Sequence, residues 1–77
     1  DPIRQGGNMP CIVNAANEIV NRGFLENRCG FLDMSDIIEK TMQRVAFDPH
    51  PDYDIYIASD QEARRIATEI MNQSYTY

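Results

Sequence analysis

The sequence has little positive charge and no cluster of it. Lys and Arg number seven against twelve Asp and Glu, which gives a formal net charge of −5. Because neutralisation of phosphates supplies most of the affinity for nucleic acids, scattered basic residues argue against nucleic acid and against an anionic membrane surface as partners. The basic residues are Arg4, Arg22, Arg28, Lys40, Arg44, Arg64 and Arg65.

Long apolar runs are also missing. No stretch approaches the roughly 18 apolar residues that a membrane-spanning helix needs, and the first residues lack the basic-then-apolar pattern of a signal peptide. With 77 residues, of which 43% are hydrophobic, the chain has room for one small domain. We therefore expect a cytoplasmic protein, or one from which a targeting segment has been removed.

Cysteine and histidine are scarce. Cys11 and Cys29 are too few for a disulfide scaffold and match no zinc-binding pattern. We expect both to be reduced thiols packed as small apolar groups; a reactive thiol near a helix start is the alternative for Cys11. The single histidine, His50, lies between two prolines with no nucleophile near it in sequence, so we expect an exposed loop residue.

The patterns that hold metals and phosphates are absent as well. The acidic residues between positions 48 and 62 lack the alternating ligands, central Gly and final Glu of a calcium loop. Gly6 and Gly7 precede a helix, but the phosphate-binding fingerprints need more glycines after a strand. From the residues alone we assign no catalytic, cofactor-binding or metal-binding residue.

Two segments in the first half of the chain have apolar residues at spacings of three and four, the period of an amphipathic helix. The first runs from about Met9 to about Glu26, with Asn8 as its cap. The second runs from about Asp33 to about Val45. Asp33 is expected to cap it, and Phe31 to pack back onto it as a hydrophobic staple.

The second half of the chain contains one ambiguous stretch, from Tyr53 to Ala58. Its alternating apolar residues fit a strand, but a single strand has no partner here, so we favour a short helical turn. Ser59 and Glu62 then match the capping box of a third helix. The prediction is an all-α fold, a small antiparallel bundle of three main helices plus a short helical turn. Residues 1–5 would be a remnant or linker, 6–73 the bundle and 74–77 a frayed tail.

An unusual polar stripe lies on the first predicted helix. Asn14, Asn17 and Asn21 share one helical face, although asparagine is a poor helix former. We interpret the face that includes Glu18 as one that hydrogen-bonds loop backbone, either within the bundle or on a domain outside the chain. Gly23 in the same helix predicts that another group passes close to it.

Arg64 and Arg65 follow the predicted start of the third helix. Arginines at this point can pair with nearby acidic residues such as Asp60, Glu62 and Glu69 on the same helix. We interpret the two arginines as surface residues in such pairs. The alternative is a docking contact to another domain, for which Arg64 and Asp60 are the candidates.

Five elements of the chain occur in an order and spacing that is specific to one family. They are Gly6-Gly7 with Pro10, Asn14 to Glu18, Phe24-Leu25, Phe31 to Met34, and Asp60 to Arg64. Over about residues 6–72 the sequence resembles the C-terminal helical domain of 1-deoxy-D-xylulose 5-phosphate reductoisomerase. It departs from that family's pattern at Leu32, where Thr is usual, at Cys29 and Gly23, and in residues 1–5, which are unlike the helix that normally precedes Gly-Gly.

The resemblance implies an enzyme of non-mevalonate isoprenoid biosynthesis. Such an enzyme converts 1-deoxy-D-xylulose 5-phosphate to 2-C-methyl-D-erythritol 4-phosphate with NADPH and a divalent metal (Mg or Mn), as a cytoplasmic homodimer. In the family the NADPH and metal sites lie in other domains, so no catalytic residue is carried over, and this chain is implied to be a non-catalytic support for those domains. The alternative is a free-standing helical module that binds a partner helix in an apolar groove.

Overall fold

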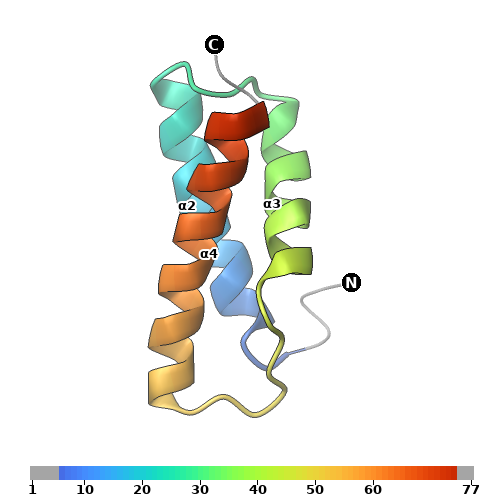
Figure 1. Cartoon of the computed structure of the whole chain (residues 1–77), viewed down its shortest axis with the longest axis vertical. Coiled ribbons are helices and arrows are strands. Elements are labelled where there is room, and N and C mark those ends of the chain that lie inside the picture. The colour runs from blue at the N-terminus through green and yellow to red at the C-terminus, as the bar shows by residue number, and fades with distance from the viewer. Residues whose placement is uncertain (1–5, 75–77) are drawn as a thin grey trace.

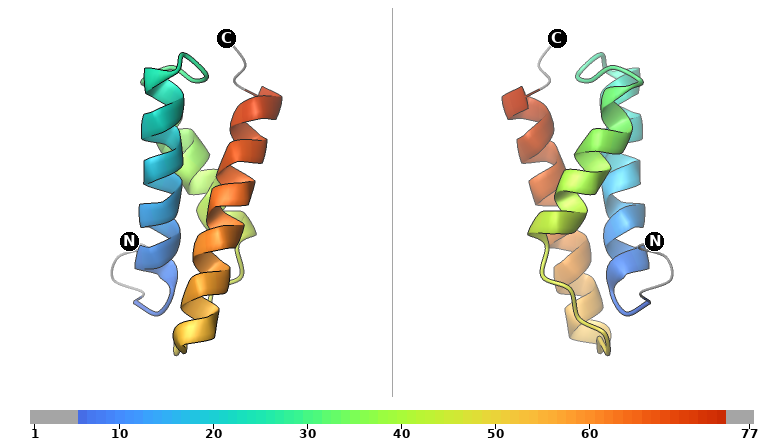
Figure 2. Two further views of the ribbon diagram at one scale, coloured as in Figure 1. Left: turned by 90° about the vertical axis from the view of Figure 1, so that its left-hand side faces the viewer. Right: turned by 90° about the vertical axis from the view of Figure 1, so that its right-hand side faces the viewer.

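Three α-helices form the fold of residues 6–74, the part of the chain that the computed structural model describes. Helix α2 spans Met9–Leu25, α3 spans Asp33–Arg44 and α4 spans Tyr53–Ser74. Successive helices run in opposite directions (Figure 1), and α3 lies across one side of the α2–α4 pair (Figure 2). The predicted all-α antiparallel bundle is therefore confirmed. The predicted remnant at 1–5 and residues 75–77 of the predicted tail at 74–77 lie outside the described residues, and Ser74 is the last residue of α4.

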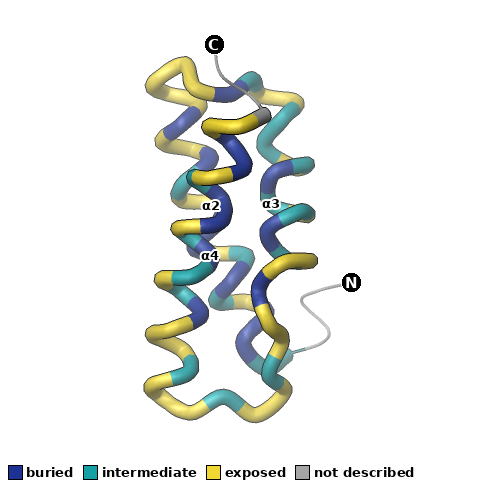
Figure 3. The backbone as a smooth tube through the Cα atoms, viewed as in Figure 1, coloured by how far each residue is buried: buried dark blue, intermediate teal, exposed yellow. Residues whose placement is uncertain are grey.

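The core lies along the line where the three helices face one another (Figure 3). Alanines on α2 and α4, among them Ala16 and Ala67, are fully buried, so these two helices approach closely. Larger side chains such as Ile12, Val20 and Ile37 fill the remaining space and are also fully buried. Burial of one such aliphatic side chain contributes about 1.5–3 kcal/mol, which makes this line the main source of stability.

Gly23 has the close neighbour that its sequence position predicts. A Cβ added there would overlap the Met71 sulfur and lie 3.0 Å from Met71 Cε and 3.5 Å from Cys29 Sγ. The missing side chain on α2 thus makes room for Met71 of α4. A glycine inside a helix lowers helix stability by about 1 kcal/mol relative to alanine. This packing therefore comes with that loss.

The predicted start of the third helix at Ser59 is wrong. Residues 53–58 are helical, as favoured over a strand, but they are the first turns of α4 and continue through Ser59 without a break. The first turn is capped by Asp52, whose Oδ1 accepts a hydrogen bond from the Ile55 N–H at 2.8 Å. Ser59 is buried and faces Asn8, and Glu62 pairs with Arg65, so neither residue serves as a cap.

Asn8 occupies the N-cap position of α2, as predicted, but its side chain does not cap that helix. Its Nδ2 donates to the Ala46 carbonyl and to Ser59 Oγ, both at 2.9 Å, and its Oδ1 accepts from the Asp48 N–H at 2.8 Å. Asn8 is only 1% exposed. This one side chain therefore connects the start of α2, the α3–α4 loop and the second turn of α4.

The start of α3 also differs from the prediction. Leu32, not Asp33, holds the N-cap position, and Asp33 Oδ2 accepts instead from the Gly30 N–H at 2.9 Å. The ring of Phe31, which was expected to pack back onto α3, has an aromatic contact with another helix. Its ring contacts Phe24 of α2 edge-on, with 6.0 Å between the ring centroids, and stays 70% exposed.

Candidate functional site

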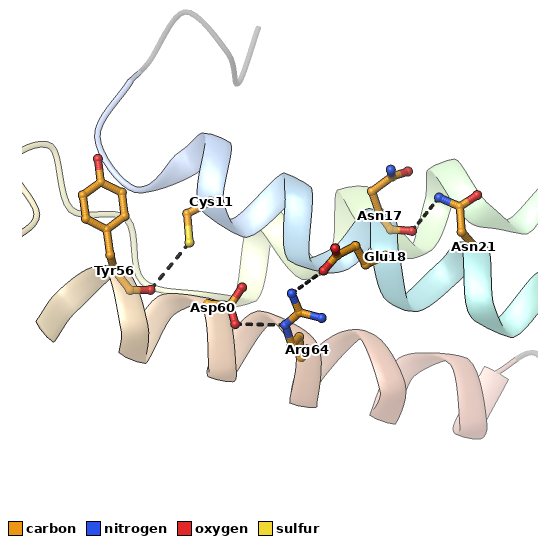
Figure 4. A network of polar contacts seen from close by, with 7 residues as sticks. All are labelled: Cys11, Asn17, Glu18, Asn21, Tyr56, Asp60 and Arg64. Carbon is orange, nitrogen blue, oxygen red and sulfur yellow. Dashed lines mark hydrogen bonds and ion pairs between the residues drawn. The ribbon is translucent and has the colours of Figure 1, made fainter. Parts of the chain in front are cut away.

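Three of the five residues singled out in the sequence meet at the seam between α2 and α4. Arg64 Nε donates to Asp60 Oδ2 at 2.9 Å, one helical turn earlier, and Arg64 Nη2 donates to Glu18 Oε2 on α2 (Figure 4). Both carboxylates raise the pKa of the Arg64 guanidinium, the hydrogen bond to Asp60 most of all. We call these three residues the Arg64 bridge; they join two helices.

The neighbouring arginine stays on α4. Arg65 Nε donates to Glu62 Oε1 at 2.7 Å and Arg65 Nη1 donates to Glu69 Oε2 at 3.0 Å. These local pairs confirm the predicted surface ion pairs. Such exposed pairs contribute little to stability because water screens both partners.

The asparagine stripe of α2 is exposed along its whole length. Asn21 Nδ2 donates to the Asn17 carbonyl at 2.8 Å, which is a contact within the same helix. Within residues 6–74 the side chains of Asn14 and Asn17 have no hydrogen-bond partner. The structure therefore brings Glu18, Asp60 and Arg64 together but leaves Asn14 and Asn17 facing outward from the bundle.

Cys11 lies next to the Arg64 bridge, and its Sγ donates to the Tyr56 carbonyl at 3.5 Å (Figure 4). Burial raises the pKa of the Cys11 thiol, Asp60 raises it further, and Arg64 lowers it. The expected alternative of an activated thiolate at a helix start is therefore not supported. Cys29 is buried, and burial and Asp33 raise the pKa of its thiol too. Both cysteines are free, as predicted.

The remaining candidate groups are not assembled into a reactive site. Among residues 6–74 no cluster of three or more His, Cys, Asp or Glu could hold a metal ion, and no helix there is both long and apolar enough to cross a membrane. His50 is exposed in the α3–α4 loop, where its main-chain N–H donates to Asp48 Oδ1. A hollow of about 510 Å³ beside Asn8 is lined by apolar side chains, by Ser59 and by the charged residues Arg44, Asp48, Glu62 and Arg65. The candidate residues therefore join α2 to α4 through the Arg64 bridge and leave the amides of Asn14 and Asn17 exposed on the surface of α2.

Sequence reasoning treated Asn8 and Ser59 as helix caps and missed their contact with each other, and it also missed the cap at Asp52. Asn8 and Ser59 contact each other across 51 residues, and no local pattern marks such a pair. Asp52 was marked by a signal that a search for caps could have found, because Pro51-Asp52 stands directly before the helical segment.

Comparison with known proteins identifies the family. The family described as the DXP reductoisomerase C-terminal domain matches residues 1–66 of the chain. The 1-deoxy-D-xylulose 5-phosphate reductoisomerase of Bacteroides thetaiotaomicron is 63% identical over 67 residues, which are 87% of this chain and 17% of that protein. The enzyme of the same name from Acetivibrio thermocellus is 45% identical over 71 residues, 92% of this chain and 19% of that protein.

The relatives are much longer than this chain. The chain spans less than a fifth of the length of the curated relatives that it matches first, and no solved structure matches it. The match nevertheless covers most of the bundle, including the asparagine stripe and the Arg64 bridge. The chain therefore belongs to the DXP reductoisomerase C-terminal domain family.

Proposed function

We propose that this chain is the C-terminal helical domain of a 1-deoxy-D-xylulose 5-phosphate reductoisomerase, a support that takes no part in the chemistry. The observation that carries the proposal is the match to that family over residues 1–66, together with relatives that extend far beyond the matched segment. The complete enzyme would form 2-C-methyl-D-erythritol 4-phosphate with NADPH and Mg²⁺ or Mn²⁺. It would be a cytoplasmic homodimer whose cofactor and metal sites lie outside this chain.

The five candidate residues take two roles in this proposal. Glu18, Asp60 and Arg64 link α2 to α4 at the surface, beside the buried core that holds the two helices together. Asn14 and Asn17 dock on the catalytic part, where their amides hydrogen-bond loop backbone. An amide that is buried without a partner costs about 1–3 kcal/mol, so the facing surface must supply matching donors and acceptors.

The experiment that tests this function uses the protein encoded by the complete reading frame. Oxidation of NADPH that depends on 1-deoxy-D-xylulose 5-phosphate and on a divalent metal supports the proposal. A reading frame that starts close to Asp1, or a complete protein without this activity, overturns it and favours the helical interaction module.

The supporting role is tested by Asn17→Ala in the same complete protein. We expect a lower melting temperature with little change in KM for the substrate, because the amide contributes to docking and not to catalysis. Gln61→Ala is the matched control, since Gln61 is an exposed amide on the outer face of α4. An unchanged melting temperature with a large rise in KM would contradict the supporting role.

A further inference from the structure

The hollow beside Asn8 has the size of a small-molecule site. It measures about 510 Å³, within the range of roughly 300–1,000 Å³ that is typical of ligand pockets. Its lining comes from the end of α3, the α3–α4 connection and the first half of α4 (Figure 1), and none of the Arg64 bridge residues lines it. The apolar lining residues are Val45, Ala46, Phe47, Ile55, Ala58 and Ile66.

The floor of the hollow is held in place by the core of the bundle. Val45, Ile66 and Ser59 are buried. Asn8, which is also buried, hydrogen-bonds the α3–α4 connection and Ser59 at the same time. Ligand pockets are usually formed before the ligand arrives, and a floor fixed in this way meets that condition. Phe47 remains 43% exposed at the hollow, so a ligand that covers its ring removes apolar surface from water.

Arg44 has a guanidinium that is available to a ligand at this hollow. The other arginine there, Arg65, is already paired with Glu62. Asp48 Oδ1 accepts a hydrogen bond from the main-chain N–H of the next residue but one. Arg44 lies in the last turn of α3, is exposed, and its side chain has no ion pair or hydrogen bond among residues 6–74. A guanidinium of this kind binds a carboxylate through two parallel hydrogen bonds.

We propose that the hollow is a binding site for a small monocarboxylate with an apolar body. The carboxylate pairs with Arg44, and the apolar body covers Phe47 and Ile55. The carboxylates of Asp48 and Glu62 also line the hollow, and because like charges repel, they favour a singly charged ligand over a doubly charged phosphate ester. This inference goes beyond the proposed function, since the hollow contains none of the residues to which that function gives a role.

Isothermal titration calorimetry of the complete protein with octanoate tests the inference. We expect saturable binding of one octanoate per chain. Octanamide is the matched probe, because it has the same apolar chain and no charge, and it should bind at least about tenfold more weakly. If octanoate does not bind, the hollow is covered by another part of the complete protein or has no affinity for the carboxylate, and the inference is overturned. Equal affinity for the two probes overturns it too.

Three substitutions locate the bound octanoate. Arg44→Gln should weaken binding about tenfold. Arg22→Gln is the matched control, since Arg22 is likewise exposed in the last turn of a helix, has no side-chain partner in the part of the chain that the structure describes, and lies outside the hollow. Ala58→Phe fills the hollow from an exposed position on α4 and should abolish binding. If Arg22→Gln weakens binding as much as Arg44→Gln does, or if Ala58→Phe has no effect, octanoate binds elsewhere and the proposed site is refuted.

The carboxylate site and the proposed function fail independently of each other. An enzyme that is active in the NADPH assay but does not bind octanoate refutes the carboxylate site alone. A complete protein that binds octanoate through Arg44 and has no reductoisomerase activity refutes the proposed function alone.

Discussion

Asn8 and Ser59 are hydrogen-bonded across 51 residues of sequence, and Asn8 at the same time pairs with the main chain of Ala46 and Asp48. One buried amide thereby satisfies three polar groups, two in the α3–α4 loop and one on α4. Buried polar groups that lose their partners cost more than the net value of the bond, about 1–3 kcal/mol for each group. Loss of the Asn8 side chain is therefore expected to lower the stability of the bundle.

Asn8→Ala is therefore predicted to destabilise the chain by about 2–4 kcal/mol, because it leaves an N–H, a carbonyl and a hydroxyl without partners. Urea unfolding measures the change in free energy. Asn21→Ala is the control, since Asn21 is exposed and alanine is the better helix former; that variant should be neutral or slightly stabilising. Equal effects of the two substitutions would show that the Asn8 contacts add nothing.

Gly7→Ala should be more harmful than Gly6→Ala, although both glycines have a positive φ, +59° and +65°. Around Gly6 no atom lies within 4 Å of an added Cβ, whereas at Gly7 the Cβ would overlap the Asp48 carbonyl and lie 2.9 Å from Pro49 Cα. We expect a loss of about 1–2 kcal/mol at Gly6, from backbone strain alone. At Gly7 we expect roughly 3 kcal/mol or more.

The comparison of Gly6→Ala and Gly7→Ala separates backbone strain from steric overlap. The stability of each variant is measured by thermal unfolding followed by circular dichroism. If both variants lose the same stability, the loop from α3 to α4 does not pack on Gly7 as the structure indicates.

The number and type of the helices were predictable because the core faces repeat at helical spacing in each segment. Helix ends were less predictable, since the groups that end a helix also take part in contacts between distant segments. Ser59 and Glu62 have the spacing of a capping box, yet Ser59 serves Asn8 and Glu62 serves Arg65. Ser59 is buried against Asn8, and α4 begins earlier, at Tyr53, where Asp52 accepts from the Ile55 N–H.

The candidate site was predictable where its contacts are local. The Asp60–Arg64 pair is one helical turn apart and follows from spacing, but the Glu18–Arg64 pair spans 46 residues and depends on how α2 packs on α4. The exposed stripe of Asn14 and Asn17 was visible as a pattern. Its lack of a partner within residues 6–74 emerges only once the other helices are in place.

The Glu18–Arg64 contact is predicted to contribute less than about 1 kcal/mol, because both side chains remain more than one third exposed. A double-mutant cycle with Glu18→Gln and Arg64→Gln measures the coupling free energy. We expect this coupling to shrink in 1 M salt, where the Debye length is about 3 Å. A coupling well above 1 kcal/mol that salt does not change would show that the bridge is shielded from solvent.

The two thiols make stability depend on pH in the alkaline range. Their ordinary pKa is 9.0, and burial is the first cause that raises it in the folded chain. The unfolded chain then loses these protons at a lower pH than the folded chain does. Their contribution is therefore fully present below pH 9.0 and is lost as the pH rises through the higher folded pKa of each thiol.

We accordingly predict that the free energy of unfolding falls above pH 9, and that the fall is less steep in the Cys11→Ala, Cys29→Ala double variant. Urea unfolding at a series of pH values measures both slopes, and the difference between them removes the titration of tyrosine and lysine, which the two proteins share. Parallel slopes would mean that both thiols ionise as easily in the folded chain as in the unfolded one. Under that outcome Cys29, which is 3% exposed, would also react with a thiol reagent at the rate of a free cysteine, whereas its burial predicts a much slower reaction.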